Sequence, residues 1–355
     1  MFAQQAGQSH VLMLASAGLA YVYSSQGKLQ RAFAVCQDAI EIADKFRLRT
    51  NRLFTAAACV YAELSNILVQ WGKTEPALQA ARKGLALGEL WGQTDTIVLC
   101  LLNLIKGFSF ALETETAKFY IERARKIAQK VSAWFMLFVN DFEVRLWLNT
   151  SDTARINSIS PHAFNKLRLS TQARLLFQRN QLDEALYLVD QNLPAVLNTS
   201  SLDAVRLGIV KSLVLYKKGD KPAAITALKW SLEQSIPENY VAAFVCEGER
   251  MEALLRLALS QNINREYVRQ LLSAFEARRG QAPTPIVEPL IEPLSEREKE
   301  VLHMLDGPLA AVDIAEQLFV STHTIRTHIK NIYFKLGVHG RSGAVKRARE
   351  LGLLG

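Results

Sequence analysis

The sequence has few cysteines, and none of them lies close to another. Its 355 residues include only Cys36, Cys59, Cys100 and Cys246, and no two of these form a Cys-x-x-Cys pair. Zinc ribbons and thioredoxin-like sites need such pairs, so neither is supported. We predict buried, reduced thiols in a cytoplasmic protein that has no metal site and no cofactor.

Long apolar runs and targeting signals are also missing. The longest apolar stretches, at 97–105 and 134–139, are shorter than the ~18 residues that a membrane-spanning helix needs. The N-terminus, MFAQQAGQSH, has neither the basic start nor the apolar core of a signal peptide. These features favour a cytoplasmic protein without a membrane partner.

Signatures of catalysis are missing as well. The sequence has no paired carboxylate motif, metal-ligand cluster or nucleophile motif, and His10, His162 and His303 are isolated. The stretch WGKTE at 71–75 contains the Gly-Lys-Thr that ends a phosphate-binding loop. The first glycine of such a loop would fall at Ile67, and a helical stretch precedes the motif where a strand is needed. We therefore predict that the protein is not an enzyme.

The sequence is rich in apolar residues and carries a moderate positive charge. Apolar residues make up 49% of it, which is enough for a large core, and the formal net charge is +8. A mild excess of positive charge is compatible with an anionic partner but identifies none by itself. The length allows about two or three domains.

A helical hairpin pattern recurs through the first 280 residues. Each copy has a turn residue, an alanine five positions later, and further small or apolar residues at helical spacing. The turn residue and its alanine are Gly27 and Ala32, Gly72 and Ala77, Asn180 and Ala185, and Gly219 and Ala224; a weaker copy without the glycine surrounds Ala117. Small residues allow two antiparallel helices to approach closely, and the turn residue relieves backbone strain between them.

The spacing of these alanines predicts a solenoid. It is about 40 residues, with one double step between positions 117 and 185. A single hairpin leaves an apolar face in water, so successive hairpins stack. The array resembles a degenerate tetratricopeptide domain, in particular the helical-repeat domain of MalT-like regulators. An irregular all-α domain with coincidental alanines is the alternative.

Four prolines lie close together after the repeats. They occupy thirteen residues, QAPTPIVEPLIEP, at 281–293. Proline cannot continue a helix, so we predict a semi-stiff linker there. The predicted organisation is a repeat domain at 1–280, a proline-rich linker at 281–293 and a small module at 294–355.

The small module reads as four short helices. Ser295 and Glu298 form a capping box at the start of LSEREKEVLHML, and AVDIAEQLF offers a second short amphipathic helix. Ser321 is a good N-cap for a third helix, and residues 341–350 make a fourth. Two short helices joined by a tight turn in a small basic module indicate a helix-turn-helix.

The third helix of the module has two contrasting sides. Ile325, Ile329, Ile332 and Leu336 form one apolar stripe that packs on the first two helices. The opposite side presents the polar and basic residues His323, Arg326, Thr327 and Lys330.

No aspartate or glutamate occurs between residues 317 and 349, whereas seven arginines and lysines do. A threonine methyl can contact a thymine methyl, arginine or lysine can donate to guanine, and acids are disfavoured near phosphates. This pattern favours a DNA-reading helix over a merely solvated basic face.

The module resembles the LuxR-type DNA-binding domain over residues 294–354. The stretches that carry the resemblance are LSEREKEVL, DIAEQLFVSTHTIRTHIKNIYFKLGV and the following R…AV. In that family the third helix enters the major groove. The resemblance implies base contacts from Arg326, Thr327 and Lys330, and places Thr322, Thr324, His328 and Lys335 near phosphates. It also implies a homodimer on inverted half-sites of promoter DNA, formed through the fourth helix with Val345 and Ala348 as contacts.

Two residues depart from what the family pattern leads us to expect. The second helix usually begins with a serine or threonine cap, but Ala310 stands there, which weakens the cap by about 1 kcal/mol. Phe334 points away from the apolar stripe. It is expected to pack on another domain, to pack on a second protomer, or to be exposed.

Taken whole, the chain resembles the C-terminal portion of the large ATP-dependent LuxR regulators, the MalT-like group. The ATPase domain of that group is absent from this sequence, so ATP dependence is not carried over. The resemblance implies a sequence-specific transcriptional regulator, an activator, whose repeat groove receives a small-molecule inducer or a protein partner. The alternative is a helical-repeat scaffold without specific DNA binding.

Overall fold

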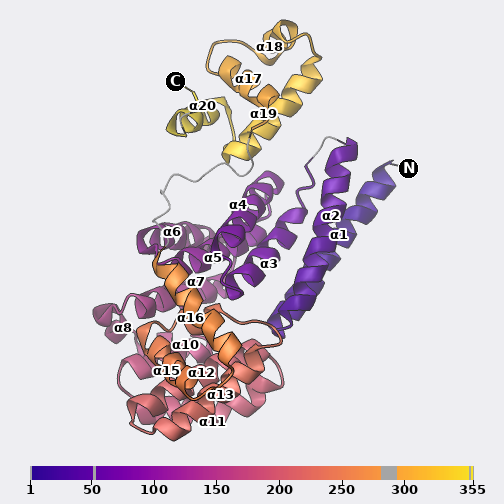
Figure 1. Cartoon of the computed structure of the whole chain (residues 1–355). Coiled ribbons are helices and arrows are strands. Elements are labelled where there is room, and N and C mark those ends of the chain that lie inside the picture. The colour runs from indigo at the N-terminus through magenta and orange to yellow at the C-terminus, as the bar shows by residue number, and fades with distance from the viewer. Residues whose placement is uncertain (1, 51–52, 281–293, 352, 355) are drawn as a thin grey trace.

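The computed structural model describes residues 2–50, 53–280, 294–351 and 353–354, and all regular structure in these ranges is α-helical (Figure 1). The predicted linker at 281–293 lies outside the described residues. None of the described helices is long and apolar enough to cross a lipid bilayer.

The first part of the chain is an array of helical hairpins, and the two helices of each hairpin pack on one another. The hairpins are α1 (Phe2–Ser25) with α2 (Leu29–Thr50), α3 (Ala57–Gln70) with α4 (Thr74–Trp91), α5 (Thr94–Phe110) with α6 (Thr114–Val131), α7 (Ala133–Asn149) with α8 (Thr153–Ser158), α10 (Leu169–Gln178) with α11 (Leu182–Leu197), α12 (Ser201–Lys217) with α13 (Lys221–Ser235), and α15 (Glu249–Ser260) with α16 (Arg265–Arg279). Two short helices, α9 (Pro161–Phe164) and α14 (Ala242–Val245), lie between hairpins.

The turns of the array confirm the predicted hairpin pattern. The turn residues Gly27, Gly72, Asn180 and Gly219 have φ angles of 84°, 70°, 63° and 90°, in the left-handed region that glycine and asparagine tolerate best. The alanines that follow five positions later, and Ala117 of the weaker copy, are fully buried. The segment WGKTE is the turn between α3 and α4, as the repeat interpretation expects.

The sequence pattern does not predict two of the hairpins, because they lack the alanine five positions after the turn residue. Ser151, with φ of 53°, lies between α7 and α8, and the buried residue five positions later is Ile156. Asn262, with φ of 62°, lies between α15 and α16 and is followed by the buried Tyr267. The α7–α8 hairpin fills the double step in the alanine spacing.

The array curves until distant hairpins touch, which a simple open solenoid does not require. The Val241 N–H donates to the Gln70 carbonyl oxygen at 2.9 Å, and the Trp71 indole N–H donates to the Glu238 carbonyl oxygen at 2.9 Å. The Tyr240 hydroxyl donates to the carbonyl oxygen of Gly27. The segment between α13 and α14 therefore holds the first two hairpins against the sixth, and the inner face of the array becomes enclosed.

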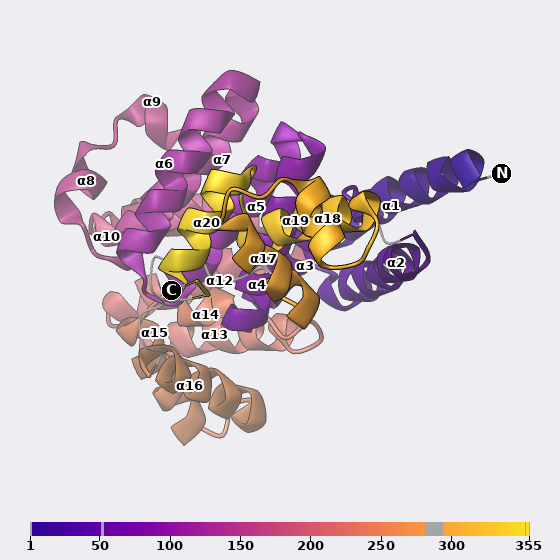
Figure 2. The same ribbon diagram turned by 90° about the horizontal axis from the view of Figure 1, so that it is seen from above.

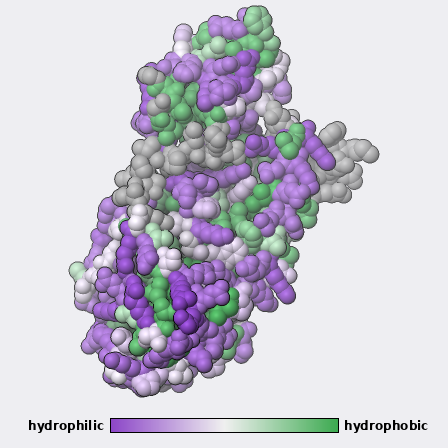
Figure 3. Space-filling model, viewed as in Figure 1, coloured by the Kyte–Doolittle hydropathy of each residue, from purple (hydrophilic) through white to green (hydrophobic). Residues whose placement is uncertain are grey.

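The C-terminal module consists of four helices, as predicted. They are α17 (Glu296–Leu305), α18 (Ala311–Gln317), α19 (Thr322–Leu336) and α20 (Arg341–Glu350). Figure 2 shows the module lying over the array, where α19 contacts α4. The capping box is present: the Ser295 hydroxyl accepts from the Glu298 N–H at 3.3 Å, and the Glu298 carboxylate accepts from the Ser295 N–H at 2.8 Å. In Figure 3, hydrophilic residues cover most of the visible face of the array, in keeping with an apolar core inside it.

Candidate nucleic-acid interface

The side of α19 that sequence analysis assigned to DNA is open to solvent. Ser321 caps the helix, and its hydroxyl accepts from the Thr324 N–H at 3.1 Å. On the opposite side Ile325 and Ile332 are fully buried in the core of the module. This packing fixes the rotation of α19, so the residues between the apolar positions face outward.

The three predicted base-contacting residues lie together on this side. Arg326 and Lys330 are exposed, and among the described residues neither has an acidic partner. Thr327 is half-buried, and its hydroxyl donates to the His323 carbonyl oxygen at 3.1 Å. That bond fixes the hydroxyl and leaves the threonine methyl available for an apolar contact. The arrangement offers two cationic donors and one small residue to a major groove.

The predicted phosphate-contacting residues divide into two groups. Thr322, Thr324 and His328 are half-buried on α19, and the first two lie in its first turn, where backbone N–H groups and the helix dipole favour an anion. Lys335 differs, because its Nζ lies 2.6 Å from Glu298 Oε2 and its side chain is only 12% exposed.

Lys335 thus holds α19 to α17, unlike the other residues that were expected near phosphates. Burial acts to raise the pKa of Glu298, but the Lys335 ammonium and the Ser295 hydrogen bonds outweigh it and lower that pKa.

The predicted dimer contacts on α20 also need a correction. Ala348 is fully buried in the core of the module, so its side chain does not reach a second protomer in this conformation. Val345 is half-buried at the edge of that core and keeps a surface that a partner can reach.

Several basic residues of the acid-free stretch support the fold instead of facing DNA. Arg341 Nε donates to the Leu305 carbonyl oxygen at 3.0 Å, at the C-terminal end of α17. Arg349 pairs with Asp306, with 2.9 Å between Nη2 and Oδ1. Glu298 and Asp306, which pair with this stretch, lie outside it, so the stretch alone does not reveal them. Arg347 pairs with Glu350, the first acid after it.

Phe334 packs against the repeat array. It is 2% exposed and belongs to the apolar cluster of the array's core, which decides among the three alternatives left by the sequence. Beside it, His339 Nε2 lies 3.8 Å from Glu89 Oε2. Phe334 lies seven residues after Thr327, which is about two helical turns, so both residues are on the same side of α19. The array therefore covers the C-terminal end of this side.

Comparisons with known proteins agree with this two-part architecture. Residues 1–261 match the family model described as the MalT-like TPR region, and residues 292–348 match that of the luxR family of bacterial regulatory proteins. The HTH-type transcriptional regulator MalT of Vibrio cholerae serotype O1 is 24% identical over 370 residues. Its namesake in Yersinia pestis (strain Pestoides F) is 26% identical over 361 residues. Each alignment covers 92% of this chain but 39% of the relative, so the chain spans well under half the length of these relatives.

Proposed function

The chain belongs to the family defined by the MalT-like TPR region, and from this premise we propose that it is a sequence-specific DNA-binding transcriptional regulator. The observation that carries the proposal is the open side of α19. It presents Arg326 and Lys330 without acidic partners among the described residues, next to the small Thr327. A helix that only covers its own domain has no need of such a surface.

In the proposed complex, α19 lies in the major groove. Arg326 and Lys330 donate to acceptors on base edges, and the Thr327 methyl contacts a thymine methyl. Thr322, Thr324 and His328 lie at the groove edge, where they position the helix on the phosphates and carry no sequence information directly. Ser321 and the buried side of α19 hold this surface in place before DNA binds.

We propose that two protomers bind inverted half-sites through α20, with Val345 at the contact. The proposed division of the chain is a repeat domain at 1–280, a linker at 281–293 and the DNA-binding module at 294–355. The repeat domain receives a small-molecule inducer or a protein partner, and the protein activates transcription. The proposed location is the cytoplasm, on the nucleoid when the protein is bound to DNA.

A selection from random duplexes tests the proposal without knowledge of the natural promoter. The full chain is mixed with a library of DNA duplexes that contain a random central region, and bound duplexes are amplified and sequenced over several rounds at moderate salt. We expect a shared motif with two inverted halves. A scaffold without specific DNA binding predicts no enrichment of any motif, which would contradict the proposal.

Two variants sharpen the selection. Lys330→Ala removes a proposed base contact and is expected to weaken binding to the selected duplex by ~1–3 kcal/mol. Lys126→Ala removes an exposed cation of α6 in the repeat domain, outside α19 and α20, and it serves as the matched control. We expect the control to bind every duplex about as tightly as the unchanged chain.

A further inference from the structure

The inner face of the curved array lines a partly open cavity of about 430 Å³. Its walls come mainly from the first helix of six successive hairpins: α1, α3, α5, α7, α10 and α12. The volume suits a small organic molecule and is too small for a folded segment of a partner protein. The sequence predicts a groove in the array and offers Trp134 among the tryptophans that could line it, but it does not predict the cationic residues of this cavity.

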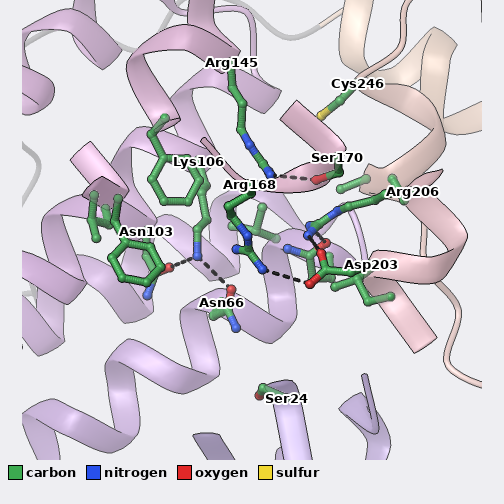
Figure 4. A pocket seen from close by; sticks show the side chains of 18 of the residues that line it. Ser24, Asn66, Asn103, Lys106, Arg145, Arg168, Ser170, Asp203, Arg206 and Cys246 are labelled. Carbon is green, nitrogen blue, oxygen red and sulfur yellow. Dashed lines mark hydrogen bonds and ion pairs between the residues drawn. The ribbon is translucent and has the colours of Figure 1, made fainter. Parts of the chain in front are cut away.

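Five cationic side chains line the cavity, and four of them come together from different helices in Figure 4. They are Lys106 of α5, Arg145 of α7, Arg168 at the N-cap of α10, Arg174 of α10 and Arg206 of α12. The carboxylates at or just behind the wall are Glu63, Asp141, Asp203 and Glu247.

Two of the arginines share one carboxylate. Arg168 Nη2 lies 3.0 Å from one oxygen of Asp203, and Arg206 Nη1 lies 3.0 Å from the other. Burial acts to raise the pKa of Asp203, but the nearby arginines Arg206, Arg168 and Arg145 outweigh it and lower that pKa. Asp203 therefore stays ionised, and each of its oxygens already accepts from one of these arginines.

Lys106 has no carboxylate partner. Its Nζ donates to the side-chain oxygens of Asn66 and Asn103, each at 2.9 Å, and among the described residues no acid lies within ion-pair distance. An ammonium has three N–H donors, so one remains for a ligand. Burial lowers the pKa of Lys106. The negative charge of Glu63 acts to raise this pKa, whereas the positive charges of Arg168, Arg206 and Arg145 lower it further.

Glu63 is the acid whose charge acts most strongly on Lys106. Its surroundings do little to stabilise an ionised carboxylate. It is 8% exposed, and its Oε2 has no hydrogen-bond partner among the described residues. Burial raises its pKa, which Lys106 only partly opposes. Arg145 and Arg174 pair with Asp141 and Glu247, at 2.8 Å and 3.0 Å. Lys106 is therefore the lining cation without a carboxylate partner among the described residues, and an added anion would supply one.

One side of the cavity is aromatic. Trp134, Phe138 and Phe142 line it, and Trp134 is 49% exposed. The Lys106 ammonium lies 5.1 Å from the centre of the Phe142 ring. A ligand that fits has a charged end near the cations and a flat or apolar end against these rings.

We propose that this cavity binds a small organic oxyanion, a carboxylate or phosphate ester with an apolar group. Lys106, Arg145 and Arg168 hold the anionic end, and the aromatic wall receives the apolar end. The inference rests on the proposed function, because it names the chemical class of the inducer that the repeat domain receives.

Thermal unfolding and calorimetric titration of the full chain test the inference with defined probes. Phenyl phosphate and benzoate are the anionic aromatic probes, inorganic phosphate is the probe without an apolar group, and benzyl alcohol is the neutral one. We expect phenyl phosphate or benzoate to bind and to raise the unfolding temperature, with benzyl alcohol at least tenfold weaker. Equal binding of benzyl alcohol, or binding of inorganic phosphate alone, would overturn the proposal.

Lys106→Met separates ligand binding from folding. It removes a buried cation that has no acidic partner, so we expect the unliganded chain to remain as stable as before, or to become more stable. Affinity for the anionic probe is expected to fall at least tenfold. Lys211→Met is the control, because Lys211 pairs with Asp190 at 2.6 Å outside the cavity. If Lys106→Met binds the probe as tightly as this control does, the inference is wrong.

The two proposals fail separately. Probe binding is measured without DNA, so an empty cavity leaves the duplex selection unaffected. If no motif is selected but the probes bind, DNA recognition fails while the anion site stands. If the probes do not bind but a motif is selected, the anion site is wrong while DNA recognition stands.

Discussion

Glu298 links two helices of the DNA-binding module through one carboxylate. It accepts from the Ser295 N–H at 2.8 Å, which caps α17, and its Oε2 lies 2.6 Å from the Lys335 ammonium of α19. Both side chains of the pair are mostly buried, with 5% of Glu298 and 12% of Lys335 exposed. A buried charge that loses its partner is costly, so either residue alone is sensitive to substitution.

The first prediction concerns this pair. Glu298→Gln leaves the Lys335 ammonium buried without a counter-charge, and we expect a loss of ~3 kcal/mol at neutral pH. The pKa of Glu298 is lowered in the folded state, so its contribution to stability is fully present at pH values above the ordinary pKa of a glutamate. This contribution is lost as the pH falls through the pKa that Glu298 has in the folded state. Hydrogen exchange of α17 and α19 in the full chain, measured at pH 7 and below pH 4, reports both effects.

The control is Glu296→Gln, because the Glu296 side chain is 86% exposed and pairs with Lys299 at the surface. It should leave exchange at both pH values nearly unchanged. Exchange in the Glu298→Gln variant that matches this control at neutral pH would contradict the assignment.

The second prediction concerns a strained turn. Leu112, between α5 and α6, has φ of 64°, and its side chain is 50% exposed. A left-handed backbone costs a residue with a Cβ atom roughly 1–2 kcal/mol, whereas glycine avoids that cost. Leu112→Gly is expected to stabilise the array by up to ~1 kcal/mol after the greater freedom of the unfolded glycine is subtracted. Chemical denaturation measures the change.

The opposite substitution is the check on this argument. Gly219 has φ of 90°, and open space surrounds the position of an added Cβ. Gly219→Ala therefore isolates the backbone cost, and we expect a loss of ~1 kcal/mol. If both variants shift stability in the same direction, turn strain is not the cause.

At the scale of the elements, sequence patterning located most hairpins and all four helices of the module. The alanines at five positions after a turn were visible because close helix packing requires a small residue there. The α7–α8 and α15–α16 hairpins were not found, because Ile156 and Tyr267 fill the same buried position with larger side chains. Their neighbours adapt to the larger volume, and no local rule of composition predicts that.

Helical periodicity predicts the open side of α19 but overestimates its positive charge. Arg326 and Lys330 could be placed by helical periodicity alone, since buried isoleucines fix the rotation of the helix. Lys335 was expected near phosphates, but it pairs with Glu298, and Arg349 of the same acid-free stretch pairs with Asp306. Ion pairs between residues distant in sequence depend on tertiary packing, which a helical pattern does not contain.

The third prediction belongs to α18. Its N-cap, Ala310, has φ of −80° and ψ of 165°, the backbone conformation of a cap, but it has no side-chain acceptor. Asp313 supplies half of a capping box, since its carboxylate accepts from the Ala310 N–H at 2.7 Å. Ala310→Ser adds the missing acceptor for the Asp313 N–H and should stabilise the module by ~1 kcal/mol. Hydrogen exchange of the first turn of α18 reports the gain, and Ala310→Gly is the comparison that adds no hydroxyl.

At the scale of the whole molecule, the array is closed by contacts between residues far apart in the chain. Tyr240 reaches the first hairpin, and the buried Arg278 reaches the third. Sequence analysis predicted stacked neighbours but not this closure, because curvature results from small rotations that accumulate over several hairpins. The cavity is a product of closure, so its residues could not be grouped from sequence alone.

The fourth prediction tests closure through Arg278. Its Nη1 donates to the Val245 carbonyl oxygen at 2.8 Å, and its Nη2 donates to the Ser109 carbonyl oxygen at 3.3 Å. Arg278→Met removes the side-chain donors to the carbonyl oxygens of Phe110, Val245 and Ser109, and we expect a loss of ~3 kcal/mol with faster hydrogen exchange in α16 and the end of α5. Arg269→Met, at an exposed position of α16, is the control. Equal exchange in both variants would show that closure does not depend on Arg278.

The central claim is that α19 reads base pairs through Arg326, and one measurement tests it most directly. The affinity of the full chain and of Arg326→Ala is determined for the selected duplex and for duplexes in which each base pair of the motif is changed in turn. We predict that Arg326→Ala lowers affinity for the selected duplex by ~1–3 kcal/mol and removes discrimination at one position of each half-site. A variant that binds every duplex more weakly by one common factor would contradict base reading by Arg326.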